Sequence, residues 1–364
     1  MKLDFQRLMV EAGRMTRVSD LRAATTAIQN ALRQRMFDAR ASMPAEAGNA
    51  LESVERFESD VVSKTVPEFG PGAAPAAPMP HPGGIPNVTT GRHVGGHGGR
   101  DFRLFVPPQA GNAPLPLVVM LHGCTQNADD FAAGTAVDAL AEKQGFYVLY
   151  PEQSAHANPQ RCWNWFKHNH QQRDRGEPAL LAGMVKQVMS THRVDPARVY
   201  VAGLSAGGAM AAILGATYPE IFAAVGVHSG LAAGAATDLP SALAAMREGG
   251  PRRASAGLGV PTIVFHGDAD ATVHPSNGEH VVAASAGSAE ISAERIESAA
   301  GRAATRRVHR TREGRVLAEH WLVHGAAHAW SGGTRHGSYT DPQGPDATVE
   351  MLRFFFQHPR SGAH

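Results

Sequence analysis

The segment from Val199 to Gly208 constrains the fold of this chain more than any other stretch. It begins as a buried-strand pattern, passes through Gly-x-Ser-x-Gly centred on Ser205, and continues as an alanine-rich helical pattern. A strand that turns directly into a helix holds the residue at the turn in a tight backbone conformation, and the flanking glycines let the two elements approach closely. The bare pentapeptide can occur by chance in a chain with 39 glycines, but its strand and helix context favours an exposed, reactive Ser205 hydroxyl.

Short apolar runs occur on both sides of this segment and alternate with longer helical or irregular stretches. Strands separated by crossover helices are typical of a mostly parallel sheet with helices on both faces, so we expect an α/β fold. The predicted strands are Phe102–Val106, Leu117–Leu121, Phe146–Tyr150, Val199–Val201, Ala223–Val227, Pro261–Phe265 and His320–Val323.

The chain before these strands divides into two parts of different composition. Residues 1–65 begin with apolar side chains at helical spacing and predict an N-terminal helical segment. Proline and glycine crowd the next stretch, so residues 66–99 are interpreted as a linker. Residues 100–358 are long enough for a single catalytic domain of the α/β type.

A serine hydroxyl needs a base to remove its proton and an acid to orient that base, and the chain supplies both farther on. The predicted strand Pro261–Phe265 leads into His266-Gly-Asp-Ala-Asp, and open α/β sheets place functional groups in loops at the carboxyl ends of their strands. Asp270 is the preferred acid. Asp268 is the alternative, and its other role would be to hold the turn by accepting backbone amides.

The last predicted strand, His320–Val323, is followed by a loop that contains two candidate bases. His328 lies deeper in this loop and completes the chain order serine, acid, histidine that accompanies this type of strand–turn–helix motif. His324 adjoins the strand and is interpreted as a structural histidine. The sequence therefore predicts that Ser205, Asp270 and His328 form a nucleophile, an orienting acid and a base at one edge of the sheet.

Acyl transfer also requires hydrogen-bond donors for the charge that develops on the carbonyl oxygen. The amide of Ala206, directly after the serine, is one expected donor. The predicted strand Leu117–Leu121 ends at His122-Gly123-Cys124, which brings this turn to the same edge of the sheet, and the amide of Cys124 is the expected second donor. The alternative is a structural turn that merely requires glycine.

Composition argues against several other classes of protein. With 34 basic and 33 acidic residues, the formal net charge of +1 provides no field that would gather nucleic acid or an anionic membrane surface, so a neutral substrate is expected. Two cysteines form at most one disulfide and cannot make a four-ligand zinc site by themselves. A metal site at His168 and His170, or at His93 and His97, lacks neighbouring carboxylate or thiolate partners, so neither a metal nor a cofactor is expected.

The N-terminus and the hydropathy of the chain bear on its location. Residues 1–20 mix charged side chains into apolar ones, unlike a secretory signal. No stretch reaches the roughly 18 consecutive apolar residues of a membrane helix. A cytoplasmic location is expected, with export by another route as the alternative.

Together, these pieces resemble the esterase family of poly(3-hydroxybutyrate) depolymerases, which is related to feruloyl and acetylxylan esterases. The resemblance runs from about Arg100 to Gln357. The matching pieces are Leu121–Gln126 (LHGCTQ), Cys162–Trp165 (CWNW), Gly203–Gly208 (GLSAGG), His266–Asp270 (HGDAD) and Gly325–Trp330 (GAAHAW).

The resemblance implies an α/β-hydrolase fold and hydrolysis of poly(3-hydroxybutyrate) or short-chain 3-hydroxyalkanoate esters. The site residues that it implies are Ser205, Asp270 and His328 as a catalytic triad, with His122 and Cys124 on the oxyanion side. Two other functions stay open. One is a feruloyl or acetyl esterase that acts on plant polysaccharide, and the other is a non-catalytic protein associated with polymer granules.

The resemblance also concerns the tryptophans and cysteines. It implies that Trp163, Trp165 and Trp330 line the substrate cleft, and that Cys124 and Cys162 are bridged. Flat apolar rings beside the site loops suit a polyester or aromatic acyl chain, whereas core packing is the alternative for each tryptophan. A reducing cytosol argues against a permanent bridge.

The N-terminal part departs from the secreted depolymerases that the resemblance brings in, which carry a signal peptide and a separate polymer-binding module. An intracellular form is therefore expected. Amphipathic helices within residues 1–65 would either bind the surface of a polymer granule or cap the domain. The sequence leaves the acyl-chain preference and the oligomeric state open.

Overall fold

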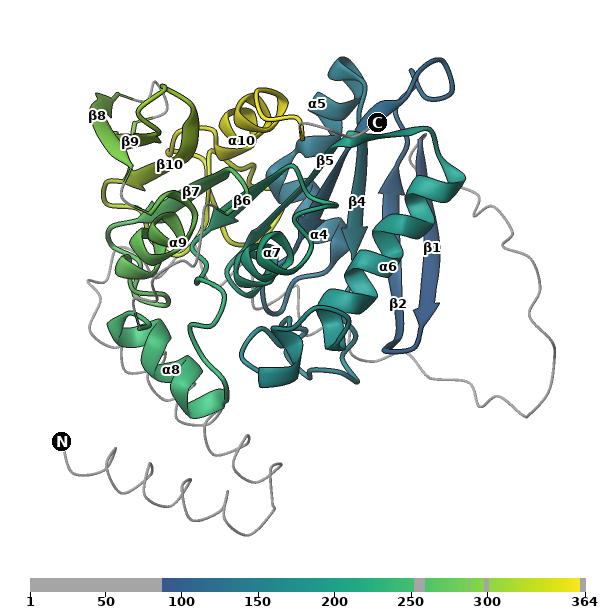
Figure 1. The fold of residues 1–364 in the computed structure, drawn as a ribbon, viewed down its shortest axis with the longest axis horizontal. Helices are drawn as coiled ribbons and strands as arrows, with labels where there is room; N and C mark the ends of the chain where they lie inside the picture. Colours follow the sequence, from purple (N-terminus) through teal and green to yellow (C-terminus); the bar gives the residue numbers. More distant parts are fainter. Residues whose placement is uncertain (1–86, 252–258, 288, 298–300, 361–364) are drawn as a thin grey trace, which may run out of the picture. The chain divides into compact units, whose positions relative to one another are not determined.

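The computed structural model describes residues 87–251, 259–287, 289–297 and 301–360 (Figure 1). The predicted helical segment at 1–65 and the first part of the predicted linker lie outside the described residues. Within the described part of the chain, none of the helices is both long and apolar enough to cross a lipid bilayer.

One large sheet organises the described residues. Its strands are β1 (Val88–Gly95), β2 (Gly98–Phe105), β3 (Leu115–Leu121), β4 (Tyr147–Pro151), β5 (Val194–Leu204), β6 (Ala224–His228), β7 (Thr262–Gly267), β8 (Glu290–Ile296), β9 (Ala304–Arg310) and β10 (Val316–Val323). They lie in the order β1-β2-β4-β3-β5-β6-β7-β10-β9-β8. The neighbours from β4 through β10 pair in parallel, while β1 and β2 at one end and β9 and β8 at the other are antiparallel.

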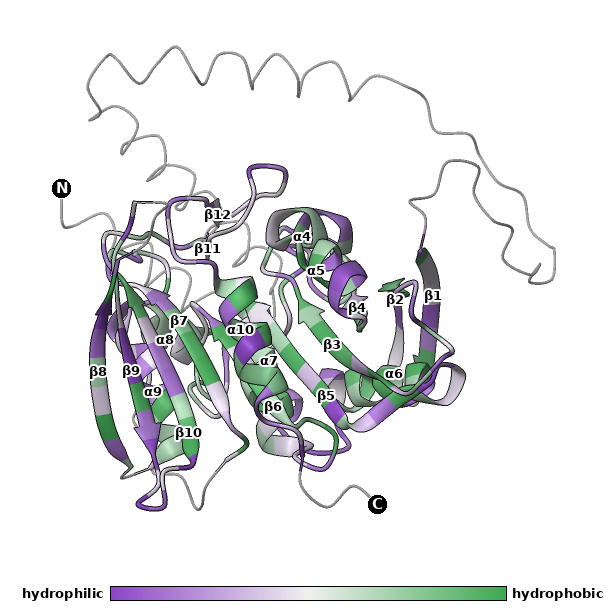
Figure 2. Cartoon of the chain, turned by 90° about the horizontal axis from the view of Figure 1, so that it is seen from above, coloured by the Kyte–Doolittle hydropathy of each residue, from purple (hydrophilic) through white to green (hydrophobic). Residues whose placement is uncertain are grey.

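Every strand predicted from the sequence is confirmed, and the strands of the large sheet that were missed lie at its two ends. β8 and β9 carry many charged residues, and most of β8 is exposed, so neither shows the apolar run of a buried strand. Figure 2 shows this difference in hydropathy between the central strands and the β8 and β9 end. Edge strands lie next to solvent and tolerate such polar sequences.

The first hairpin corrects the predicted linker. β1 and the start of β2 occupy residues 88–99, so the assignment of that stretch to the linker is wrong. Its glycine-rich sequence forms an antiparallel pair whose second strand starts at Gly98, with φ +102° directly after the turn. β1 is an edge strand with mostly exposed side chains, which explains why it lacks an apolar signature. The strand-containing domain therefore begins no later than Val88.

Helices cover both faces of the parallel strands (Figure 1). They are α4 (Ala128–Thr135), α5 (Val137–Gln144), α6 (Gly176–Thr191), α7 (Ala206–Thr217), α8 (Leu239–Glu248), α9 (Ser276–Ala286) and α10 (Ala347–Phe356), with a short 3₁₀ helix, η2 (His168–His170). On β3, Leu117 and Val119 pack into one core with residues of α6, α7 and α9. The intervening Val118 faces a second core with residues of α4, α5 and α10. This confirms the predicted sheet with two covered faces.

Candidate active site

Ser205 occupies the turn between β5 and α7. Its backbone has a positive φ of 57° with ψ −118°, a conformation that a residue with a Cβ keeps only when its surroundings enforce it. Close packing supplies the enforcement, because a Cβ at Gly207 would lie 2.0 Å from the carbonyl oxygen of Leu121 on β3. The predicted tight strand-to-helix turn is confirmed, and it leaves the Ser205 side chain partly exposed.

Asp270 and His328 meet across the loops that follow β7 and β10. His328 Nδ1 lies 2.7 Å from Asp270 Oδ2, and Asp270 Oδ1 accepts the backbone amides of Thr272 and Val273 at 2.9 Å each. Burial raises the pKa of Asp270, but hydrogen bonds from His266 and His328 outweigh it and hold this pKa well below its ordinary value. Asp270 therefore stays charged and binds Nδ1 of the imidazole, which leaves Nε2 for other chemistry.

The alternative acid, Asp268, belongs to a second pair. Its carboxylate lies 2.9 Å from His324 Nδ1 and accepts the amide of Gly325 at 2.7 Å. The side chains of Asp268 and His324 are 38% and 33% exposed. This geometry gives Asp268 the turn-holding role and leaves Asp270 as the partner of His328.

His228, which was not predicted from the sequence, connects the loop after β10 that carries His328 (the base loop) to the turn of Ser205. Its carbonyl oxygen at the end of β6 accepts the amide of Ser205 at 2.9 Å, and its ring Nε2 accepts the amide of Ser331 at 2.9 Å. Burial lowers the pKa of His228 to about 3, with smaller effects from His266 and His328, so the ring is neutral and can accept. Because Ser331 follows His328 in the same loop, the base loop is fastened beside the turn of Ser205.

The turn after β3 packs directly against the serine. A Cβ added at Gly123 would be in ordinary contact with the carbonyl oxygen of Leu204 at 3.5 Å and with the Cβ of Ser205 at 3.7 Å, so the backbone of this turn lies close to the turn of Ser205. Ala206 begins α7 directly after the serine, and an amide in the first turn of a helix has no acceptor within that helix. The amide of Ala206 is thus available to a ligand at Ser205.

Two backbone amides of the turn after β3 donate to acceptors within the protein. The amide of Gly123 donates to Gln126 Oε1 at 2.9 Å, and the amide of Thr125 donates to the carbonyl oxygen of Gln160 at 2.6 Å. The amide of Cys124 lies between them and is the donor of this turn that remains for a ligand. The sequence-based choice of Cys124 therefore has a consistent local geometry.

A model of the family described as Esterase PHB depolymerase matches residues 100–315, which is more than half of the chain. The chain belongs to the esterase PHB depolymerase family. Its architecture is the α/β-hydrolase fold, and a structure described as acetyl xylan esterase from Aspergillus awamori resembles it with a TM-score of 0.58 at 20% identity. That likeness covers 74% of this chain and 99% of the other. The predicted family and fold are both confirmed.

Relatives of this family member include both polyester and plant-cell-wall esterases. Poly(3-hydroxyalkanoate) depolymerase C from Paucimonas lemoignei is 37% identical over 188 residues, which is 48% of this chain and 45% of that protein. Feruloyl esterase B from Thermothelomyces thermophilus is 34% identical over 140 residues, 38% of this chain and 47% of that protein. Poly(3-hydroxybutyrate) depolymerase from Ralstonia pickettii is 29% identical over 248 residues, 62% of this chain and 50% of that protein. The chain spans about half the length of these relatives.

In this esterase family member, His122 orients a backbone donor. Its Nε2 accepts the amide of Gln153 at 3.1 Å, so Nδ1 carries the hydrogen and donates to the carbonyl oxygen of Gly123 at 2.7 Å. Burial lowers the pKa of His122 to about 4, which keeps the ring neutral. Both ring nitrogens of His122 are used inside the protein, so any role of this residue on the oxyanion side is indirect and passes through the backbone of the turn. The Gly123 carbonyl and the Cys124 amide belong to one planar peptide group, so the ring fixes the direction of that amide.

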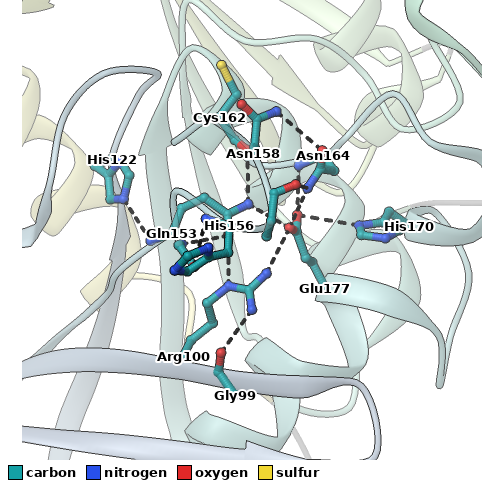
Figure 3. Close-up of polar contacts among 12 residues, drawn as sticks. Gly99, Arg100, His122, Gln153, His156, Asn158, Cys162, Asn164, His170 and Glu177 are labelled. Atoms are coloured by element: carbon teal, nitrogen blue, oxygen red, sulfur yellow. Dashed lines mark hydrogen bonds and ion pairs between the residues drawn. The ribbon is translucent and has the colours of Figure 1, made fainter. Parts of the chain in front are cut away.

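A buried polar network lies next to the turn after β3 (residues 122–126, the oxyanion turn) and holds the long loop between β4 and α6 (Figure 3). At its centre, Glu177 accepts from Gln153 Nε2 at 2.6 Å, from the amide and side chain of Asn164 at 2.7 Å each, and from Arg100 at 3.4 Å. Burial raises the pKa of Glu177, but hydrogen bonds from His170 and Gln153 outweigh it and lower this pKa below its ordinary value. A lone glutamate at the start of a helix gives no sequence signal of such a role.

Cys124 and Cys162 form the disulfide that the resemblance implied. The bridge joins the oxyanion turn to the loop that carries Asn164, so the polar network and the disulfide restrain the same two segments. The disulfide and the polar network thereby restrain the position of the Cys124 amide.

The three tryptophans are buried instead of lining an open cleft. Trp163, Trp165 and Trp330 retain 0%, 5% and 1% of their exposure. Trp163 Nε1 donates to the carbonyl oxygen of His122 at 3.1 Å, and Trp330 Nε1 donates to Thr348 Oγ1 at 3.0 Å. The prediction that these rings line the substrate cleft is therefore wrong. All three belong to the hydrophobic cores on the two faces of the sheet, which is the core-packing alternative.

Over the described ranges, no group of three or more His, Cys, Asp or Glu side chains is arranged to hold a metal ion. Two of the four histidines that were considered for such a site lie beside polar side chains. His93 Nδ1 lies 2.6 Å from Gln187 Oε1, and His170 Nδ1 lies 3.4 Å from Glu177.

Proposed function

We propose that this chain is a serine esterase that hydrolyses poly(3-hydroxybutyrate) or short-chain 3-hydroxyalkanoate esters through an acyl-enzyme. The observation that carries the proposal is the 2.7 Å pairing of buried Asp270 with His328, in a loop that His228 fastens beside Ser205. A nucleophile, a base and an orienting acid at one sheet edge are the groups that acyl transfer needs. Membership of an esterase family supports ester hydrolysis as the reaction.

In the first step, Ser205 Oγ attacks the ester carbonyl while His328 Nε2 takes its proton. His328 uses Nε2 because its Nδ1–H donates to Asp270. The charge that develops on the carbonyl oxygen accepts hydrogen bonds from the amides of Cys124 and Ala206. His328 then returns the proton to the leaving alkoxide, and the alcohol departs while the acyl group stays on Ser205.

In the second step, a water molecule gives a proton to His328 and attacks the acyl group. Collapse of this intermediate releases the acid, and His328 returns the proton to Ser205. Asp270 stabilises the positive charge that the imidazole gains in each step. Losing one oxyanion donor should cost about 3 kcal/mol of transition-state stabilisation, whereas losing Ser205 should remove nearly all catalysis by the triad.

The substrate rests on weaker support than the reaction. A polyester is preferred because two depolymerase relatives match the chain, and the alignment with one of them covers 62% of this chain. A feruloyl or acetyl esterase acting on plant polysaccharide is the second candidate, supported by the feruloyl esterase relative. A non-catalytic role on polymer granules is the third hypothesis.

One experiment distinguishes these functions. Purified protein, Ser205→Ala and the matched control Asp268→Asn are each given amorphous poly(3-hydroxybutyrate) and methyl ferulate. We expect the wild type and Asp268→Asn to release 3-hydroxybutyrate and to cleave methyl ferulate much more slowly, while Ser205→Ala releases no acid. Faster cleavage of methyl ferulate would favour the second candidate. Granule binding by wild type and Ser205→Ala alike, without hydrolysis of either ester, would favour the third.

A further inference from the structure

An aromatic ring is exposed at the rim of the proposed site. Among the large apolar side chains that are exposed in the described part of the chain, Tyr339 is aromatic and 48% exposed, while the others are aliphatic. Tyr339 precedes a short strand, β12 (Thr340–Asp341), which pairs with β11 (Trp330–Ser331) just after His328. An exposed apolar side chain is common by itself, so the position of the ring has to decide its role.

Tyr339 connects the two loops that bear the reactive groups. Its carbonyl oxygen accepts the amide of Trp330 at 2.7 Å, close to His328 in the base loop. Its hydroxyl lies 3.1 Å from Oγ1 of Thr125, which follows Cys124 in the oxyanion turn. The residue therefore spans from the base loop to the oxyanion turn.

The backbone that presents this ring is held firmly. Tyr339 has φ 52°, which bulky residues rarely adopt and which neighbouring contacts must maintain. Ser338 donates its amide and its hydroxyl to the carboxylate of Asp130 at 2.8 and 2.6 Å. Gln126 Nε2 donates to Asp130 at 2.8 Å and to the carbonyl oxygen of Ser338 at 3.1 Å, while its Oε1 accepts the amide of Gly123. One side chain thus shapes both the oxyanion turn and the loop of Tyr339.

We propose that Tyr339 is a substrate-contacting residue that sets selectivity for the length of the ester chain. The face of the phenol ring binds the hydrocarbon of the acyl or alcohol chain where it passes the oxyanion turn. A flat ring buries aliphatic surface well, and its fixed backbone and hydroxyl reduce the entropy lost on binding. The inference rests on the proposed function, because it takes Ser205 as the place where the ester is cleaved. Tyr339 then fills the exposed role that the buried tryptophans do not.

Steady-state kinetics with three esters test this inference. The esters are p-nitrophenyl acetate, p-nitrophenyl octanoate with a long acyl chain, and octyl acetate with a long alcohol chain. For Tyr339→Ala, we expect the kcat/KM of at least one long ester, relative to p-nitrophenyl acetate, to fall about tenfold and mainly through KM. Tyr339→Phe keeps the ring and should keep both ratios within about twofold. His336→Ala, an exposed residue of the same loop, is the matched control.

Several results would overturn the inference. They are unchanged ratios for both long esters in Tyr339→Ala, with or without an equal loss of activity on all three esters, and a wild type that cleaves neither long ester. Unchanged ratios with an equal loss on all three esters in both Tyr339→Ala and Tyr339→Phe would mean that the hydroxyl merely supports Thr125. If thermal unfolding shows that Tyr339→Ala is misfolded, Tyr339→Leu removes the flat ring and carries the same prediction. Cleavage of a 3-hydroxybutyrate trimer by the wild type tests the proposed substrate separately, because the ratios among simple esters depend on cleavage at Ser205 but not on a polyester as the substrate.

Discussion

Two aspartate–histidine pairs lie in the same two loops of this protein, and they differ in burial far more than in distance. The inner pair, Asp270 and His328, has side chains that are 0% and 12% exposed at a separation of 2.7 Å. The outer pair, Asp268 and His324, is about one-third exposed at 2.9 Å. An ion-pair distance alone therefore does not distinguish a catalytic pair from a structural one.

Burial changes what each carboxylate can do. Water competes for the oxygens of the outer pair and screens its charge, so that pair contributes little beyond fastening its turn. Asp270 is removed from water, and the amides of Thr272 and Val273 occupy its second oxygen. Its charge therefore acts on the imidazole of His328 with little competition. We expect the inner pair to serve the chemistry and the outer pair to serve the fold.

Replacing each histidine by alanine in turn tests this comparison with the largest expected effect. His328→Ala should lower kcat for p-nitrophenyl butyrate by about a millionfold, because Ser205 loses its proton acceptor. His324→Ala should keep kcat within about fivefold, because its pair is solvated. Initial rates measured on folded variants check both values. Equal losses in the two variants would remove the distinction between the pairs.

The two aspartates provide the next largest contrast. Asp270→Asn should lower kcat by about ten-thousandfold, because the neutral amide neither orients the imidazole of His328 correctly nor balances its charge. Asp268→Asn should affect thermal stability more than activity. The same kinetic assay measures both, with circular dichroism as the check on folding. A larger activity loss from Asp268→Asn would reassign the acid.

The buried His122 extends the comparison to the oxyanion side. His122→Phe removes the hydrogen bond to the carbonyl oxygen of Gly123, and with it the orientation of the Cys124 amide. We expect kcat to fall about a hundredfold to a thousandfold while KM stays within about threefold. His168→Ala, at an exposed histidine, is the control. Unchanged kcat in His122→Phe would mean that the turn holds its shape without the ring.

The smallest effect concerns stability and pH. His320 is buried in the sheet, and burial lowers its pKa to about 3, against about 6.5 in an unfolded chain. Below pH 6.5, His320 therefore binds a proton in the unfolded chain but stays neutral in the folded protein. The free energy of unfolding consequently falls as the pH drops below about 6.5. Between pH 6.5 and 5, His320 should account for about 2 kcal/mol of this loss.

Urea unfolding at several pH values measures the contribution of His320. His320→Phe should reduce the loss of stability below pH 6.5, whereas the exposed His336→Phe should leave the pH dependence of the wild type intact. An unaltered pH dependence in His320→Phe would show that the buried ring is protonated in the folded state.

The sequence revealed the centre of the fold because burial on two faces leaves a local mark. β3 and β7 carry continuous apolar runs, and each run ends at a glycine-containing loop. β8 and β9 carry no such mark, because β8 is an exposed edge strand and the neighbouring β9 is only partly buried, so both depend on pairing with a neighbour. β1 was not predicted because it is also an exposed edge strand, and its sequence lies in a glycine-rich stretch without an apolar run.

The candidate site was predictable where its chemistry follows a strand in a short motif. Ser205, Asp270 and His328 each stand in a loop directly after a strand, so their residue types and order were informative. Trp163 and Glu177 depend on contacts between segments far apart in the chain, and nothing in their own neighbourhood shows which way they face. Packing therefore decided both the burial of the tryptophan and the role of the glutamate.

His328, in the loop after β10, is proposed to activate Ser205, in the turn after β5. Reaction with a p-nitrophenyl alkylphosphonate, followed by peptide mass mapping, measures this most directly. The account predicts one adduct, on Ser205, that forms at least about a thousandfold more slowly in His328→Ala. An adduct on another side chain, or equal rates in the two proteins, would contradict it.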